Sequence, residues 1–193
     1  FGPHGGGKAE AGLEEGGDMA FVPDIKLEDG DVILGNGWTV DVIHTPGHLS
    51  NHVCFGLREE NTLFTGDHVM GWSTTVVSPP DGNMSAYMQS LEKLLQFDYD
   101  TYWPTHGPAI TETKPFVEAL IAHRQERMDQ IRGCLRSGPM TIPKMVKRMY
   151  TDVPENLHPA AARSVYAHIL HMVESGEISA EEGASETAVY SLK

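Results

Sequence analysis

The chain has 193 residues, which suffices to bury a hydrophobic core in one domain, or in one medium domain and a small one. Its formal net charge of −13 disfavours non-specific binding to nucleic-acid backbones, without excluding a local basic patch. It contains no apolar run of about 18 residues and no secretory signal, so we expect a soluble, cytoplasmic protein that does not bind membranes.

The start of the chain is compositionally distinct. Residues 1–20 are rich in glycine and glutamate and nearly free of large apolar side chains, which predicts a flexible segment. Phe1 is not a translation start, so we expect that a preceding segment is missing. The two cysteines, Cys54 and Cys134, form no Cys-x-x-Cys pair, which argues against a disulfide framework or a cysteine zinc site.

From Ile25 onward, short β-type runs alternate with turn residues. Their close spacing predicts an antiparallel, meander-like sheet. The four predicted strands cover residues 31–34, 38–44, 52–57 and 62–65. Helical spacing of apolar residues then predicts two helices, 85–97 and 115–135. Strands followed by helices indicate an α/β (α+β) fold, in which helices pack on a sheet.

The tail after Gly138-Pro139 has a different pattern. It predicts two short helices, 143–150 and 160–175, and then a hairpin over 177–193 with its turn at Glu182-Gly183. Helix, helix and hairpin together resemble a winged helix. We therefore divide the chain into a flexible start, a sheet-and-helix portion over residues 21–132 and a winged-helix-like domain over residues 133–193.

Three short motifs place ligand-type side chains after predicted strands. Thr45-Pro46-Gly47-His48 follows the second strand, Gly66-Asp67 ends the fourth strand, and Thr105-His106-Gly107 lies in a loop bounded by proline and glycine. Imidazoles and one carboxylate suit a borderline cation such as Zn²⁺. Each motif alone is weak, but their joint occurrence in this order makes chance a poor explanation.

In this order the motifs resemble the later motifs of the metallo-β-lactamase superfamily, over about residues 25–125. The resemblance implies the C-terminal part of an αββα sandwich and a site for two zinc ions. It assigns His48 to one metal, Asp67 to a bridge between both, and His106 to the second. It also implies a hydrolase, in which metal-bound hydroxide attacks an ester, thioester, lactone or phosphodiester.

Further stretches resemble a lactamase-B-like subgroup with a C-terminal winged helix. They are Gly66 to Thr75, the run Pro79-Pro80-Asp81-Gly82, and Pro154 to His158 in the tail. That subgroup includes endoribonuclease-like members as well as other hydrolases. Zinc hydrolysis of a small molecule is the leading hypothesis, and RNA cleavage is the alternative within enzymes.

The early motif of the family, His-x-His-x-Asp-His, does not occur in this sequence, and His4 has no neighbours that could replace it. Truncation explains this better than divergence. Each metal would then have two ligands from this chain, so we expect weak or no metal binding and no activity. Thr105, where relatives often have glycine, is a smaller departure.

Residues near the three ligands have other expected roles. His44 and His52 should pack beside the site or orient its ligands, whereas His68, Trp72, Thr74 and Thr75 are candidates for the wall of a substrate pocket. The winged helix could contact RNA, with Lys144, Lys147 and Arg148 on one helix, or mediate a homodimer. From a different class, the chain could be a non-catalytic winged-helix binding module.

Overall fold

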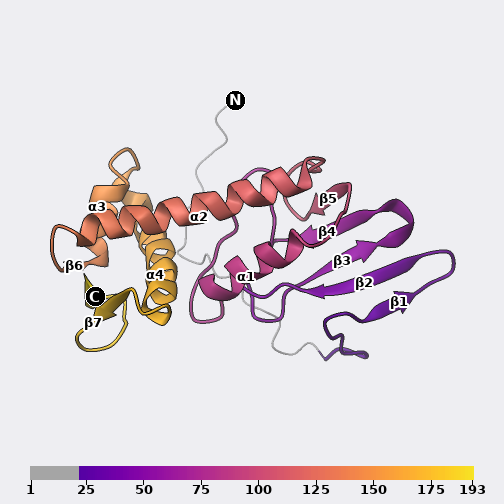
Figure 1. Cartoon of the computed structure of the whole chain (residues 1–193), viewed down its shortest axis with the longest axis horizontal. Helices are drawn as coiled ribbons and strands as arrows, with labels where there is room; N and C mark the ends of the chain where they lie inside the picture. Colours follow the sequence, from indigo (N-terminus) through magenta and orange to yellow (C-terminus); the bar gives the residue numbers. More distant parts are fainter. Residues whose placement is uncertain (1–21) are drawn as a thin grey trace.

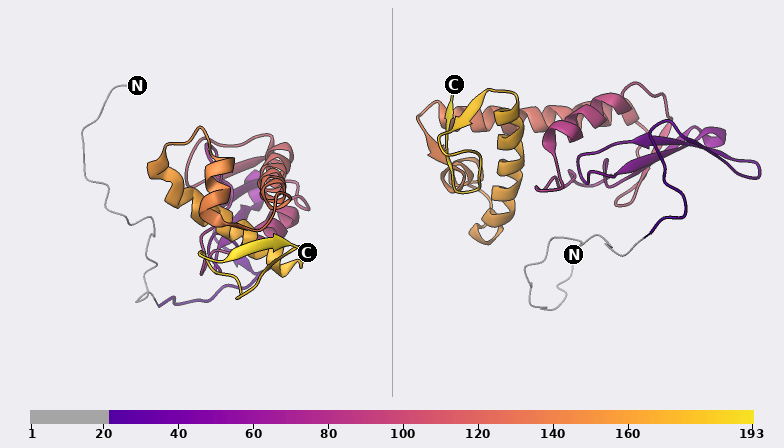
Figure 2. Two further views of the ribbon diagram at one scale, coloured as in Figure 1. Left: turned by 90° about the vertical axis from the view of Figure 1, so that its left-hand side faces the viewer. Right: turned by 90° about the horizontal axis from the view of Figure 1, so that it is seen from below.

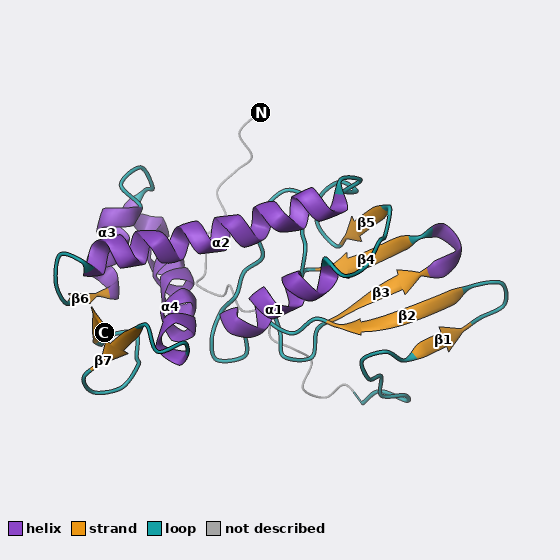
Figure 3. Ribbon diagram, viewed as in Figure 1, coloured by secondary structure: helices purple, strands orange, loops and turns teal. Residues whose placement is uncertain are grey.

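The computed structural model describes residues 22–193 (Figure 1). The predicted flexible start, residues 1–20, lies outside the described residues. A five-stranded sheet and helices α1 and α2 form one part, and α3, α4 and a small three-stranded sheet form the other (Figure 3). The predicted fold class, helices on a sheet followed by a small helical domain with a hairpin, is confirmed.

The larger sheet has its strands in chain order. Each of the first three strands pairs with the next in antiparallel fashion, so the predicted meander is correct. Asn61, the one non-glycine residue with positive φ among those described, turns the chain between the third and fourth strands. The strands are β1 (Val32–Leu34), β2 (Thr39–His44), β3 (Val53–Leu57), β4 (Thr62–Gly66) and β5 (Thr101–Pro104).

The fifth strand was missed by the sequence analysis, which predicted the loop of Thr105 to Gly107 but no strand before it. β5 instead pairs with β4 in parallel, and Tyr102 also bridges to Ile110. Parallel pairing requires a crossover, and α1 (Met84–Leu94) supplies it between β4 and β5. Because the crossover decides the pairing, no local pattern in this four-residue segment predicts it. His106 still lies in the turn after the strand.

The two helices α1 and α2 (Thr113–Leu135) cover one face of this sheet (Figure 1). Asn83 caps α1 by accepting a hydrogen bond from the backbone N–H of Ala86 at 2.9 Å. The core between sheet and helices includes Ile43, Cys54, Leu63, Tyr87, Leu91, Leu94, Tyr102, Val117 and Leu120.

The opposite face of the sheet is largely open. Val42, Phe55, Phe64 and Trp103 stand in register across four neighbouring strands. Val42 is buried, but Phe64 and Trp103 are 45% and 50% exposed. An apolar groove lies beside this row and reaches Gly66 and Thr105, the residues before two of the candidate ligands.

The C-terminal part contains the predicted helices and hairpin. They are α3 (Ile142–Met149), α4 (His158–Glu174), β7 (Ile178–Ala180) and β8 (Val189–Leu192). The chain between the hairpin strands runs from residue 181 to 188 and includes the predicted turn at Gly183, where φ is positive. A short strand that the sequence did not reveal, β6 (Met140–Thr141), adds to β8.

Helix α2 joins the two parts (Figure 2). Its N-terminal half contributes Val117 and Leu120 to the core under the sheet, and its C-terminal half contributes Met128 and Ile131 to the core of the C-terminal part. The predicted division between residues 132 and 133 falls inside this helix and stays a prediction. No helix within residues 22–193 is both long enough and apolar enough to cross a bilayer.

Candidate metal centre

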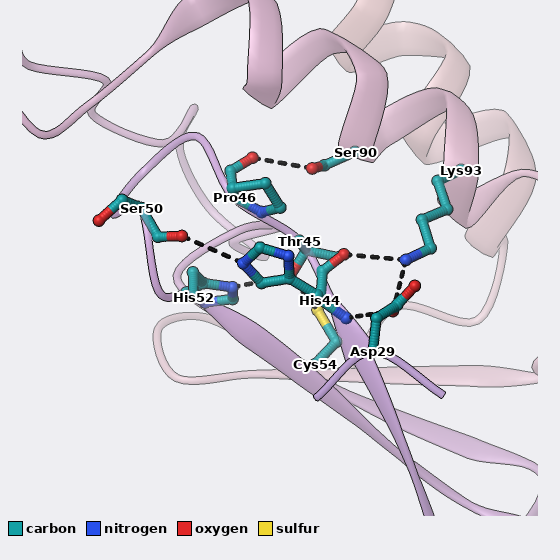
Figure 4. Close-up of polar contacts among 9 residues, drawn as sticks. All are labelled: Asp29, His44, Thr45, Pro46, Ser50, His52, Cys54, Ser90 and Lys93. Carbon is teal, nitrogen blue, oxygen red and sulfur yellow. Dashed lines mark hydrogen bonds and ion pairs between the residues drawn. The ribbon is translucent and has the colours of Figure 1, made fainter. Parts of the chain in front are cut away.

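The end of β2 is held in place by an ion pair (Figure 4). The backbone N–H of His44 donates to the carboxylate of Asp29 at 2.8 Å. The Lys93 ammonium of α1 contacts the same carboxylate at 2.6 Å and the His44 carbonyl at 3.0 Å. This ion pair and the hydrogen bond lower the pKa of Asp29. The strand end therefore stays next to α1 at the point where the chain turns toward His48.

The turn itself is fixed from both sides. Ser90 of α1 donates to the carbonyl of Pro46 at 2.8 Å, and the Thr45 hydroxyl lies 2.8 Å from Nδ1 of His52 (Figure 4). Gly47 has a φ of 141°, and a Cβ there would lie 2.3 Å from the Cα of Tyr87. Only glycine fits so close to the helix, which explains the Pro-Gly pair before His48.

His48 presents one particular nitrogen to the site. Its Nδ1 lies 2.7 Å from the carbonyl oxygen of Val76. A carbonyl only accepts, so Nδ1 carries the proton and the lone pair of the neutral ring is on Nε2. That Nε2 lies 3.9 Å from Oδ2 of Asp67.

Asp67 follows directly after β4. Gly66 has a φ of 54°, and a Cβ at that position would lie 2.6 Å from Nε2 of His52, so glycine lets the chain leave the strand here. Oδ1 of Asp67 lies 3.6 Å from Nε2 of His106. This oxygen is buried and has no hydrogen-bond partner among residues 22–193. A buried carboxylate oxygen without a partner is costly and calls for an explanation.

His106 lies in the turn after β5 and is about half exposed. Its carbonyl accepts from the N–H of Gly71 at 2.9 Å, and the N–H of Thr105 donates to the carbonyl of Gly66 at 3.1 Å. These two bonds join the loop of His106 to the loop of Asp67. The parallel pairing of β4 and β5 thus brings the second and third candidate ligands together.

The three predicted ligands therefore converge, with one carboxylate oxygen of Asp67 toward each imidazole. Such a disposition suits a carboxylate that bridges two cations, with a nitrogen donor beyond each oxygen. The donor types fit Zn²⁺, but each cation would have two protein donors. Consistently, no three His, Cys, Asp or Glu side chains within residues 22–193 are placed to hold one ion together.

Neighbouring histidines have a different environment. Burial, followed by the charge of His48, lowers the pKa of His52 to about 4. His68 is fully buried, and burial lowers its pKa to about 3. Its ring packs against Tyr87 at 4.8 Å between centroids, and neither ring nitrogen has a hydrogen-bond partner in the described part of the chain. His68 thus lies in the core behind the ligands and does not face solvent.

The other predicted pocket residues lie on the loop after Asp67. Trp72 is 73% exposed, and Thr74 is partly buried. Thr75 is buried, with its hydroxyl donating to the carbonyls of Asp67 at 2.5 Å and His68 at 3.0 Å. The structure thus places Thr75 as a support for the ligand loop, and Trp72 as an exposed side chain at its rim.

The sequence analysis missed two residues that support the ligands. Arg124 of α2 donates to the Thr75 carbonyl, and the Val76 carbonyl accepts from His48. A signal for Arg124 was present. It stands four residues after Leu120 and four before Met128, on the buried stripe of α2, where a charged residue is unusual. A backbone carbonyl such as that of Val76 has no sequence signature.

Comparisons with known proteins show the family and the fold of the chain. Residues 2–106 match the family described as the metallo-beta-lactamase superfamily, and residues 141–185 match the beta-lactamase associated winged helix domain. The chain is 36% identical over 153 residues to the Beta-lactamase-like protein 2 homolog of Drosophila melanogaster, covering 78% of this chain and 51% of that protein. It is 32% identical over 174 residues to the Lactamase-like protein nscB of Aspergillus fumigatus, covering 81% and 52%.

Solved structures show the same fold. A beta-lactamase domain protein from Burkholderia ambifaria superimposes with a TM-score of 0.79 at 23% identity, over 90% of this chain and 54% of that one. A metallo-beta-lactamase family protein from Thermus thermophilus gives 0.72 at 23% identity, over 86% and 54%. The chain spans about half the length of the curated relatives that it matches.

Proposed function

Since this chain belongs to the metallo-beta-lactamase superfamily and carries its winged-helix extension, we propose that it supplies part of a dinuclear zinc hydrolase, with His48, Asp67 and His106 as metal ligands. The proposal is specific about the metal and the ligands. The family match supports a hydrolase-type protein, and the side-chain geometry supports the ligand set.

One observation carries the proposal. Oδ1 of Asp67 is buried without a hydrogen-bond partner among the described residues, 3.6 Å from Nε2 of His106, and the other oxygen of the same carboxylate lies 3.9 Å from Nε2 of His48. At 3.6 and 3.9 Å these contacts are too long for hydrogen bonds. His48 already uses its Nδ1 proton on Val76. His48, Asp67 and His106 would hold cations here, and such binding would give the buried oxygen of Asp67 a partner.

Bound by these residues, zinc would supply Lewis acidity, the chemistry that activates water near neutral pH and polarises an electrophile. The residues of the chain set the geometry. Val76 keeps the proton of His48 on Nδ1, so that Nε2 stays a donor to metal. The two bonds between the loops of Asp67 and His106 hold those ligands at a constant spacing.

The surroundings of the ligands favour a small ester, thioester or lactone as substrate. Leu49, Trp72 and Val76 are 42%, 73% and 61% exposed, and each lies on a loop that holds a ligand. An apolar rim fits the acyl part of such a substrate better than a polyanionic backbone. The candidate cations for RNA, Lys144, Lys147 and Arg148, are exposed on α3, in the other part of the molecule.

We further propose that these 193 residues bind zinc weakly and lack activity by themselves, because each ion would have two donors among the described residues instead of four. Calorimetric titration of the chain with zinc, purified without chelator, tests this. We expect weak binding that Asp67→Asn abolishes, since this substitution removes the bridging carboxylate. Asp98→Asn, which changes an exposed carboxylate on another loop, is the matched control and should bind like the parent chain.

Two outcomes would contradict the proposal. A tight complex with two zinc ions would show that the donors present suffice. Zinc binding that Asp67→Asn does not change would show that Asp67 is not a ligand and would contradict the proposed metal centre. A test of the substrate class requires a longer protein that combines this chain with a His-x-His-x-Asp-His motif. Such a protein should hydrolyse apolar thioesters, esters or lactones faster than RNA, and the reverse preference would favour the endoribonuclease alternative.

A further inference from the structure

Arg124 is a buried cation for which residues 22–193 provide no acidic partner. The residue is 3% exposed, in the middle of α2, and no Asp or Glu within residues 22–193 forms an ion pair with it. Its Nε is buried and unpaired among the same residues. A buried charge costs free energy unless its surroundings compensate for it, so the contacts that Arg124 makes are informative.

Those contacts converge on the loop that follows Asp67. One terminal nitrogen of Arg124 donates to the carbonyl of Thr75 at 2.6 Å. The guanidinium also lies over the ring of Tyr87, 5.2 Å from its centroid, and the Tyr87 hydroxyl donates to the carbonyl of His68 at 3.1 Å. A hydrogen bond from a charged donor is roughly twice as strong as a neutral one. Arg124 thus fixes the loop from the helix side.

Two consecutive residues of this loop each hold a candidate ligand. The Thr75 hydroxyl donates to the carbonyl of Asp67 at 2.5 Å, and the Val76 carbonyl accepts from Nδ1 of His48 at 2.7 Å. The peptide unit between them contains the very carbonyl to which Arg124 donates. Arg124 therefore holds the backbone between the residue that supports Asp67 and the residue that supports His48.

We propose that Arg124 is a positioning residue for the metal centre, which sets the Nδ1–H tautomer of His48 through the Thr75–Val76 peptide. This inference rests on the proposed function, in which Nε2 of His48 binds metal. Arg124 itself touches neither substrate nor metal. Its role is to keep the Val76 carbonyl aimed at Nδ1, because an imidazole freed from that acceptor can take up the other tautomer.

The test is a nitrogen-15 NMR spectrum of the histidine rings in the whole chain, without metal and in mildly alkaline buffer. Nδ1 and Nε2 shifts report which nitrogen of His48 carries the proton. We expect a predominantly Nδ1–H ring in the parent chain. Arg124→Met keeps the length and apolar stem but has no donor, so it should convert a substantial fraction of His48 to Nε2–H. Arg124→Lys, which retains one donor and the charge, should restore part of the Nδ1–H fraction.

Arg127→Gln is the matched control. Arg127 lies on the same helix, with its guanidinium 4.9 Å from the centroid of Tyr150 and a hydrogen bond to Gln130. Its loss removes a similar cation–aromatic contact without touching the ligand loop, so the His48 spectrum should not change. A general loss of stability would affect both variants and would leave the tautomer of the folded molecules unchanged.

The outcomes are separable from those of the zinc titration. A folded Arg124→Met chain with an unchanged His48 spectrum overturns the inference. So does a parent chain in which His48 is mainly Nε2–H, a result that needs no variant to fold. If the tautomer responds to Arg124 but zinc binding ignores Asp67, the positioning contact stands and the hydrolase proposal fails. If zinc binding requires Asp67 but the tautomer does not respond to Arg124, the hydrolase proposal stands and the role of Arg124 is refuted.

Discussion

The two faces of the five-stranded sheet carry similar residues in different surroundings. On the face under α1 and α2, Cys54 and Leu63 are fully buried, whereas on the other face Phe64 and Trp103 are about half exposed. Strands with apolar residues on both sides are patterned for burial on both sides. Residue type therefore does not distinguish the two faces of this sheet, whereas the presence or absence of covering helices does.

The largest expected effect is at the covered face. Leu63→Ala removes a side chain that is fully enclosed by the core and leaves a cavity behind it. The free energy of unfolding should fall by about 2–5 kcal/mol. Urea unfolding followed by circular dichroism measures it. A loss below about 1 kcal/mol would mean that this face is less tightly packed than the structure shows.

Lowering the pH should also destabilise the covered side, because a histidine is buried there. His168 of α4 follows Ala167, which belongs to the core under the sheet, and burial lowers its pKa to about 4. The unfolded chain takes up this proton near pH 6.5, so the contribution of His168 to stability is complete above about pH 6.5 and is lost as the pH falls toward 4. At about pH 5 the loss from His168 is on the order of 2 kcal/mol.

His168→Gln provides the measurement, because glutamine cannot titrate. Urea midpoints at neutral and mildly acidic pH should differ less in this variant than in the parent chain. Other buried histidines, including His52 and His68, titrate in the same direction, so part of the acid sensitivity should remain. An unchanged pH dependence in the variant would show that His168 is already accessible to protons in the folded state.

The smallest effect is expected on the open face. Phe64→Ala removes a side chain that is 45% exposed, so the free energy of unfolding should change by less than about 1 kcal/mol. The variant should also associate less at high concentration, because it interrupts the apolar row from Val42 to Trp103. Sedimentation velocity checks the association. A loss as large as that of Leu63→Ala would contradict the distinction between the faces.

Local patterns predicted most of the fold. The alternation in β1 to β4 and the helical spacing in α1 to α4 gave elements close to their observed bounds. What local patterns did not predict were pairings between distant segments. β5 is a strand because α1 returns the chain beside β4, and β6 is a strand because β8 lies next to it. Neither partner is close in sequence.

In the candidate metal centre, too, local motifs predicted some features and contacts between distant segments decide the others. Three motifs after predicted strands, and their resemblance to a known family, made His48, Asp67 and His106 candidates from the sequence. The structure shows why glycine stands at positions 47 and 66, where other residues approach closely. The structure adds that the two imidazoles face opposite oxygens of one carboxylate. It also adds supports that carry no motif, such as the Val76 carbonyl. His68 illustrates the limit, because its burial depends on Tyr87 of α1 and not on its neighbours in sequence.

Because α2 is one continuous helix, it fixes how far the C-terminal part is rotated about the helix axis relative to the sheet. Its 23 residues extend over about 34 Å, and each residue turns the helix by about 100°. Arg124 faces the ligand loop while Met128 and Ile131 face the C-terminal core. Insertion of a single residue between Arg124 and Met128 would rotate one set against the other by more than a quarter turn. Only insertions or deletions close to a whole number of helical turns would therefore keep both sets of side chains in place, whatever residues were inserted.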